Sequence, residues 1–84
     1  MGSVARGKCS HAEGTHTYAY GLGAHAEGGR SIVKGKYAHA EGCITKAIAN
    51  MSHAEGYNTE ASGESSHAEG VNTIASGGYA HAEG

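Results

Sequence analysis

The sequence predicts an all-β fold, a parallel solenoid of six coils with 14 residues in each coil. The tetrapeptide His-Ala-Glu-Gly occurs six times, and every copy starts 14 residues after the previous one. A fixed short period is typical of repeat proteins, whose units pack mainly on their neighbours. Small residues alternate with variable ones inside each unit, which is the period of a strand. The 15 glycines and the absence of proline favour tight turns over helices.

Six units account for all 84 residues, so we expect a single domain over residues 1–84. The last unit ends on a complete motif, which suggests an excerpt from a longer array. At about 4.8 Å per layer, six coils predict a rod about 28 Å long. We number the positions of each unit from 1 to 14, with His-Ala-Glu-Gly at positions 11 to 14. The units are 1–14, 15–28, 29–42, 43–56, 57–70 and 71–84.

The first strand of each unit is expected around positions 3 to 5. Position 3 is always Ser or Thr, and position 5 is Ala in five units and Val33 in the third. Only small side chains fit between two closely spaced strands, so these positions should face inward. Gly at position 7 in five units, with Ala49 in the fourth, should mark a turn with an unusual backbone angle.

The second strand is expected around positions 10 to 13. Position 10 is Ser or Ala and position 12 is always Ala, so these positions should also face inward. The Gly at position 14 should form the second turn, also with an unusual backbone angle. Positions 4 and 6 vary freely, as a solvated face does, whereas the outward positions 11 and 13 are His and Glu in every unit. An outward face that never varies within one chain is expected to contact something.

The consensus x-x-[ST]-x-A-x-G-x-x-[SA]-H-A-E-G resembles the head repeats of trimeric autotransporter adhesins of the Yersinia adhesin type. Their 14-residue units read roughly SVAIGxxSxAxG, and residues 66–77, SHAEGVNTIASG, follow the same frame. The resemblance covers the whole chain, and His-Ala-Glu-Gly repeats are also similar to those of phage tail and fibre proteins. It implies a left-handed parallel β-roll, assembled as a homotrimer around a threefold axis.

This family usually has aliphatic residues where the present chain has His and Glu, and in the family these positions face the trimer axis. The resemblance therefore implies a polar trimer core instead of an apolar one. The residues implied at the trimer interface are His11, Glu13, His25, Glu27, His39, Glu41, His53, Glu55, His67, Glu69, His81 and Glu83.

Buried carboxylates are costly unless they are paired, so we expect hydrogen bonds between His and Glu of different chains at this interface. If Glu stabilises a protonated His, the pKa of the His rises, and the stability that this gives is lost as the pH climbs through the raised value. The pKa of the Glu falls, so its contribution is lost at low pH. The sequence thus predicts a trimer that is most stable in the weakly acidic range.

The alternative is a metal- or anion-binding module. Three imidazoles that meet on a threefold axis have the donor atoms for Zn²⁺ or Ni²⁺, and protonated imidazoles would suit an anion. Our prediction is nevertheless that the chain holds no metal or other cofactor, because six identical stacked sites exceed what a metal protein needs. The axial ligands in this alternative would be His11, His25, His39, His53, His67 and His81.

No arrangement in the sequence predicts an enzyme or a catalytic residue. His-x-Glu differs from the helical His-Glu-x-x-His of zinc peptidases, and six equivalent dyads lack the graded environments that distinguish an acid from a base. No apolar run approaches the ~20 residues of a membrane span. We therefore expect no membrane insertion by this segment, and no binding to nucleic acid.

The outward charges suggest one further contact. The net charge is −2, but six of the eight acidic residues are motif glutamates, so the remaining surface is mainly basic. The simplest interpretation is solubility, and the alternative is attachment to a host cell-surface or matrix polymer. With the resemblance, this predicts a structural or display segment on the bacterial surface or in a virion fibre. The basic residues are Arg6, Lys8, Arg30, Lys34, Lys36 and Lys46.

Overall fold

The computed structural model describes residues 2–84, and Met1 lies outside that range. Residues 2–84 form twelve short strands and no helix, so none of them belongs to a helix that could cross a membrane. The first strands of the coils are β1 (Val4–Ala5), β3 (Tyr18–Ala19), β5 (Ile32–Val33), β7 (Lys46–Ala47), β9 (Glu60–Ala61) and β11 (Ile74–Ala75). The second strands are β2 (His11–Thr15), β4 (His25–Gly29), β6 (His39–Cys43), β8 (His53–Tyr57), β10 (His67–Ala68) and β12 (His81–Ala82).

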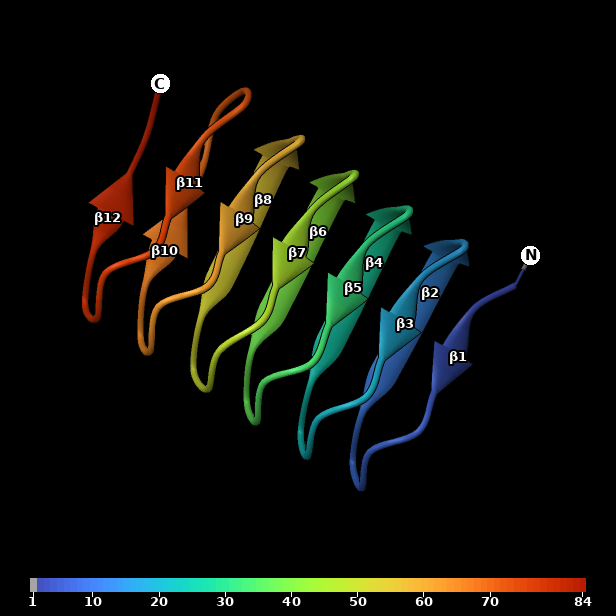
Figure 1. Cartoon of the computed structure of the whole chain (residues 1–84). Helices are drawn as coiled ribbons and strands as arrows, with labels where there is room; N and C mark the ends of the chain where they lie inside the picture. The colour runs from blue at the N-terminus through green and yellow to red at the C-terminus, as the bar shows by residue number, and fades with distance from the viewer. Residues whose placement is uncertain (1) are drawn as a thin grey trace.

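The strands form two parallel sheets that face each other, and the chain passes from one sheet to the other twice in each coil (Figure 1). Sheet A has the order β1-β3-β5-β7-β9-β11, and sheet B has the order β2-β4-β6-β8-β10-β12. Each residue pairs with the residue 14 positions away, as His25 does with His39. The longest extent is 29 Å. The predictions of an all-β fold and of a solenoid with 14-residue coils are therefore confirmed.

The core between the sheets is built from small side chains, as the alternation predicts. Ala at positions 5 and 12 is fully buried in the middle coils, and hydroxyl side chains at position 3, such as Thr17 and Thr45, are buried beside it. Val33 is the largest of the fully buried side chains. The shortest extent of the molecule is accordingly 10 Å. A core of alanines buries little apolar surface per residue, so a single coil has little stability of its own.

The glycine at position 14 is required for two reasons. It has a φ between +103° and +113° in the first five coils, and a Cβ there would lie 2.0–2.2 Å from the carbonyl oxygen of the next coil. The prediction of an unusual backbone angle is right here but wrong for position 7. Those glycines have no positive φ, and where another coil follows, its close approach leaves little room for a Cβ, although the fourth coil has Ala49 at this position. A Cβ on Gly35 would lie 1.9 Å from the Ala49 carbonyl oxygen.

Hydroxyl groups at position 3 stabilise turns that lead from sheet B to sheet A. The side chains of Ser31, Thr59 and Thr73, all at position 3, donate to the carbonyl oxygens of Glu27, Glu55 and Glu69, at 2.7, 3.1 and 3.0 Å. These bonds span three of the turns that follow a His-Ala-Glu-Gly motif. They hold the backbone of the motif glutamate, and so they help to position its side chain on the outer face of sheet B.

Candidate functional site

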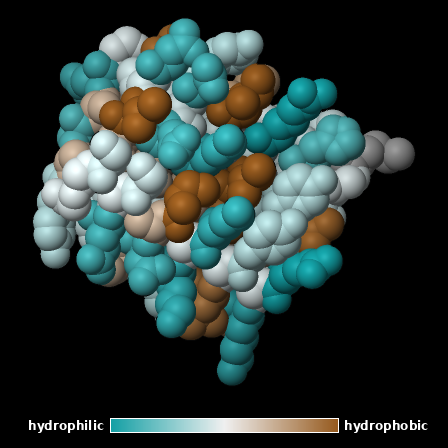
Figure 2. Space-filling view, in the orientation of Figure 1, coloured by the Kyte–Doolittle hydropathy of each residue, from teal (hydrophilic) through white to brown (hydrophobic). Residues whose placement is uncertain are grey.

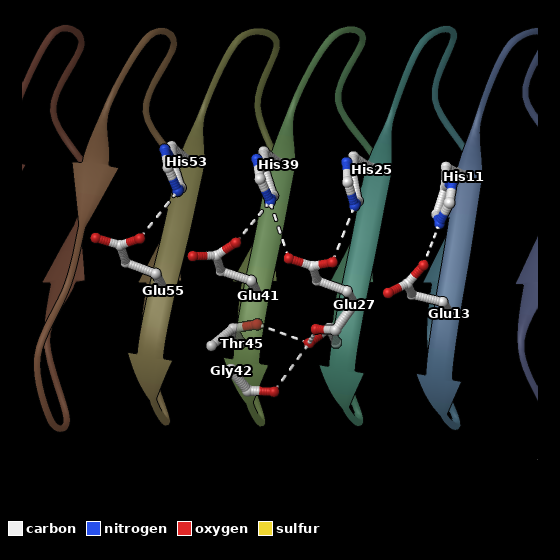
Figure 3. A network of polar contacts seen from close by, with 11 residues as sticks. His11, Glu13, His25, Glu27, His39, Glu41, Gly42, Thr45, His53 and Glu55 are labelled. Carbon is white, nitrogen blue, oxygen red and sulfur yellow. Dashed lines mark hydrogen bonds and ion pairs between the residues drawn. The ribbon is translucent and has the colours of Figure 1, made fainter.

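The six motif histidines form one continuous column on the outer face of sheet B. Because the strands are in register, each imidazole lies over the next one, with ring centroids 4.5–4.8 Å apart. The rings from His25 to His81 are nearly parallel, with interplanar angles of 2–7°. In Figure 3 the rings of the first four coils point along the strands in the same direction, toward the glutamates.

The six motif glutamates form a second column beside the first. Each carboxylate lies near the imidazole of its own coil, because residues two apart on a strand project from the same face. The distance from Nε2 to the nearest carboxylate oxygen is 2.6 Å for His11 and Glu13. In the other five coils it is 3.1–3.4 Å. The glutamates and the glycines that follow them line an open groove along the sheet.

Three of the glutamates also reach the histidine of the next coil. A second oxygen of Glu27 lies 4.0 Å from Nε2 of His39, as Figure 3 shows. Glu55 reaches His67 at 3.6 Å, and Glu69 reaches His81 at 3.6 Å. Among the residues that the structure describes, Glu13 and Glu41 have no such second histidine within 4.0 Å, and each lies near the imidazole of its own coil alone. The ladder is therefore uneven although the sequence of the motif never varies.

The middle of the two columns is partly buried in the single chain. The side chains of the histidines from His25 to His67 are 34–39% exposed. Packing between neighbouring rings buries the Nε2 atoms of His39, His53 and His67. In residues 2–84 these three atoms have short contacts to carboxylates but no well-aligned hydrogen bond.

The surroundings lower the pKa of the two central histidines. Burial penalises the charged imidazolium of His39 and His53, so the pKa of each falls below the ordinary value of 6.5. Repulsion from the neighbouring imidazoles adds to this, and the carboxylates only partly oppose it. The raised pKa that the sequence predicts concerns histidines paired between chains of a trimer, and it stays a prediction. Within one chain the pKa of these two histidines is lowered instead.

The glutamates influence one another in an alternating way. A hydrogen bond shared with Glu27 raises the pKa of Glu41, and burial and a similar bond with Glu55 add to the rise. The bond with Glu41 lowers the pKa of Glu27, and the bond with Glu69 lowers the pKa of Glu55, with His25 and His53 acting in the same direction. Like charges one coil apart cannot all ionise with equal ease. The column therefore favours ionised Glu27 and Glu55 on either side of Glu41.

All twelve residues that the sequence singles out thus lie on one face, in two adjacent columns. The 14-residue period was sufficient to predict these columns. The cross-coil contacts of Glu27, Glu55 and Glu69, and the different environment of Glu41, carry no signal in a motif that is identical in every coil. Both cysteines, Cys9 and Cys43, are exposed free thiols.

The outer face of sheet A is different in character. Figure 2 shows hydrophilic and hydrophobic residues mixed on the face toward the viewer, with no single large apolar area. Lys34, Lys36 and Lys46 are exposed. The rings of Tyr18 and Tyr20 stack at 5.9 Å, and the guanidinium of Arg6 lies 5.8 Å from the centre of the Tyr20 ring. This face resembles an ordinary solvated surface with a basic excess.

No known protein family, no curated protein and no solved structure matches this chain.

Proposed function

We propose that this chain is a structural and display segment of a homotrimeric fibre or adhesin head, in which three left-handed β-rolls pack through the outer faces of their B sheets. The His and Glu columns then lie around the threefold axis as a polar trimer core. The outer face of sheet A points away from the axis, where its lysines and arginines are available to contact an anionic cell-surface or matrix polymer. Such a protein acts at a bacterial surface or in a virion fibre, and it is not an enzyme.

The observation that supports this proposal most directly is the contrast between the two outer faces. On sheet A, position 4 carries Val, Tyr, Ile, Lys, Glu and Ile in successive coils, whereas on sheet B positions 11 and 13 are always His and Glu. A partly buried column of carboxylates is unfavourable on an isolated sheet. Donors from neighbouring chains would relieve it. The resemblance of the repeat to trimeric adhesin heads points to the same arrangement.

The mass in solution tests the proposal. We expect sedimentation equilibrium at about pH 6.5 to give three times the chain mass of 8.5 kDa, and the same mass with EDTA present. Replacing both central histidines, His39 and His53, by Asp should dissociate the trimer, because six further carboxylates would meet at the axis without a cation. The matched change of Lys34 and Lys46 on sheet A to Asp should leave the mass unchanged. A stable monomer in the parent chain would overturn the proposal.

A further inference from the structure

The two columns bring together sets of side chains that are ligands for transition metals. Four clusters, each of two histidines from neighbouring coils and the glutamate of the first coil, have ligand atoms within 4.8 Å of one another. Two imidazole nitrogens and one carboxylate are a recurrent ligand set for Zn²⁺, with a fourth position left for water or another ligand. The clusters are His25-Glu27-His39, His39-Glu41-His53, His53-Glu55-His67 and His67-Glu69-His81.

The clusters overlap, and this limits how many ions one chain can hold. The four clusters use five histidines, because His39, His53 and His67 each belong to two of them. An imidazole offers its Nε2 to one ion at a time. Each ion needs two histidines, so no more than two ions fit, and filling one cluster excludes both of its neighbours. Two neighbouring clusters therefore cannot be filled at the same time.

The geometry indicates which clusters are filled. Glu27 lies between His25 and His39, at 3.3 and 4.0 Å, and Glu55 lies between His53 and His67, at 3.3 and 3.6 Å. Glu69 lies between His67 and His81 at similar distances, 3.3 and 3.6 Å, whereas Glu41 has one histidine, His39, within 4.0 Å in residues 2–84. The clusters of Glu27 and Glu55 contain the closest ring pairs, 4.5 Å for His25 and His39 and 4.6 Å for His53 and His67, against 4.8 Å for His67 and His81.

The donors need only small movements to reach one ion, because the ligand atoms of each cluster already lie within 4.8 Å of one another. Tetrahedral zinc with Zn–N bonds of about 2.0–2.1 Å holds two nitrogens about 3.4 Å apart, so the stacked rings must turn toward each other. Because these side chains are about one-third exposed, they have room to do so.

We infer that each chain binds two Zn²⁺-class ions between neighbouring coils, one at His25, Glu27 and His39 and the other at His53, Glu55 and His67. Every protein ligand of an ion comes from a single chain. The inference is therefore independent of the trimer, and it differs from three imidazoles of three chains meeting on an axis. Bound ions would cross-link the second coil to the third and the fourth coil to the fifth.

Replacing single histidines by alanine tests whether clusters that share a histidine exclude each other. The full chain is stripped with EDTA, exchanged into buffer and titrated with Co²⁺ alone, and visible absorption reports the number of ions bound. The number of Zn²⁺ ions retained after gel filtration gives a second count. We expect two ions per parent chain, one for His39→Ala and one for His67→Ala. The two clusters that remain share one histidine in each case, His67 in the first variant and His39 in the second, so only one ion can be held.

The matched control is His53→Ala, which removes the same side chain from the coil between those two. Here the first ion stays at Glu27, and the second moves to His67, Glu69 and His81, so the count remains two. Circular dichroism checks that all three variants keep their strands. The inference would be overturned if all three variants lost the same number of bound ions. It would also be overturned if the parent chain bound four ions, one ion per three chains, or none. The mass in EDTA tests the trimer separately, so the two failures are distinguishable.

Discussion

Two residues in every coil, at positions 2 and 9, have a left-handed backbone with φ between 55° and 75°. The hydrogen bonds explain why. The N–H groups of the strands donate to the following coil, as from Val4 to Thr17, whereas the N–H of a left-handed residue donates to the preceding one, as from Ile44 to Gly29 at 2.8 Å. The sequence does not reveal these sites, because Tyr, Met, Arg and Ile occupy them beside Gly and Asn. The geometry of the coil overrides the local preference.

Ile44 is the β-branched residue among these left-handed sites, with a φ of 57°. Asn tolerates this conformation better, and the next two coils have Asn58 and Asn72 at the same position, joined by a side-chain hydrogen bond of 2.6 Å. We expect Ile44→Asn to stabilise the fold by about 1 kcal/mol, which corresponds to a rise in Tm of about 4–8 °C.

The matched control is Ile32→Asn, which makes the same change in strand β5, where the backbone is extended. It should lower the Tm, because Asn is unfavourable in strands and part of the Ile32 side chain is buried. Thermal denaturation followed by circular dichroism measures both variants. If Ile44→Asn lowers the Tm as much as Ile32→Asn does, left-handed strain at position 2 is not a significant cost.

At the scale of an element, the turn from sheet A to sheet B contains another position where the structure distinguishes residues that are alike in the sequence. Position 10 carries either Ala or Ser. The Ser10 and Ser52 hydroxyls each donate to the carbonyl at position 7, at 2.6 Å. Ser66 is as buried as Ser52, but in the described part of the chain its hydroxyl has no hydrogen-bond partner. The sequence predicted that this position faces inward; it did not predict which of the serines would be bonded.

Removing the hydroxyl should therefore have different effects in neighbouring coils. We expect Ser52→Ala to cost about 1 kcal/mol, because it removes a hydrogen bond from a buried turn. Ser66→Ala should be neutral or stabilising by up to about 1 kcal/mol, since it removes a buried polar group without a partner. Urea denaturation of the two variants measures the difference. Equal losses would mean that both hydroxyls are bonded in solution.

At the scale of the whole molecule, the strict 14-residue period was enough to predict the coils, the inward alanines and the two outer columns. Once the strands pair in register, every residue of the motif must lie over its copies. The contacts between columns do not follow from the period. Whether Glu27 or Glu41 reaches the histidine of the next coil depends on side-chain rotation, which an identical motif leaves open.

The pH dependence distinguishes a single chain from an assembly. In one chain the pKa of His39 and His53 is lowered, mainly by burial. The unfolded chain then takes up protons first as the pH falls below about 6.5. Stability is thus full above that pH and is lost on acidification. The lowered pKa values of Glu27 and Glu55 act in the same direction at lower pH, whereas the raised pKa of Glu41 opposes it.

We therefore expect the Tm of the metal-free monomer to fall between about pH 8 and pH 5, by about 4–8 °C for each kcal/mol lost. Melts of diluted protein in EDTA, at a concentration where sedimentation gives the chain mass, measure this. A trimer held by pairs between chains should instead be most stable in the weakly acidic range. A monomer that becomes more stable on acidification would show that pairing with Glu outweighs burial of the histidines.

The in-register pairing of residues 14 apart also has a genetic consequence. Deleting or duplicating one complete unit places every remaining residue beside a residue at the same position of the repeat, as the pairing of His25 with His39 and of His39 with His53 illustrates. A gene that gains or loses a multiple of 14 codons here still encodes a chain whose coils stack in register. An in-frame insertion or deletion of any other length shifts the register of the following coils. Unequal recombination can therefore change the length of the rod, while the contacts between neighbouring coils stay of the same kind.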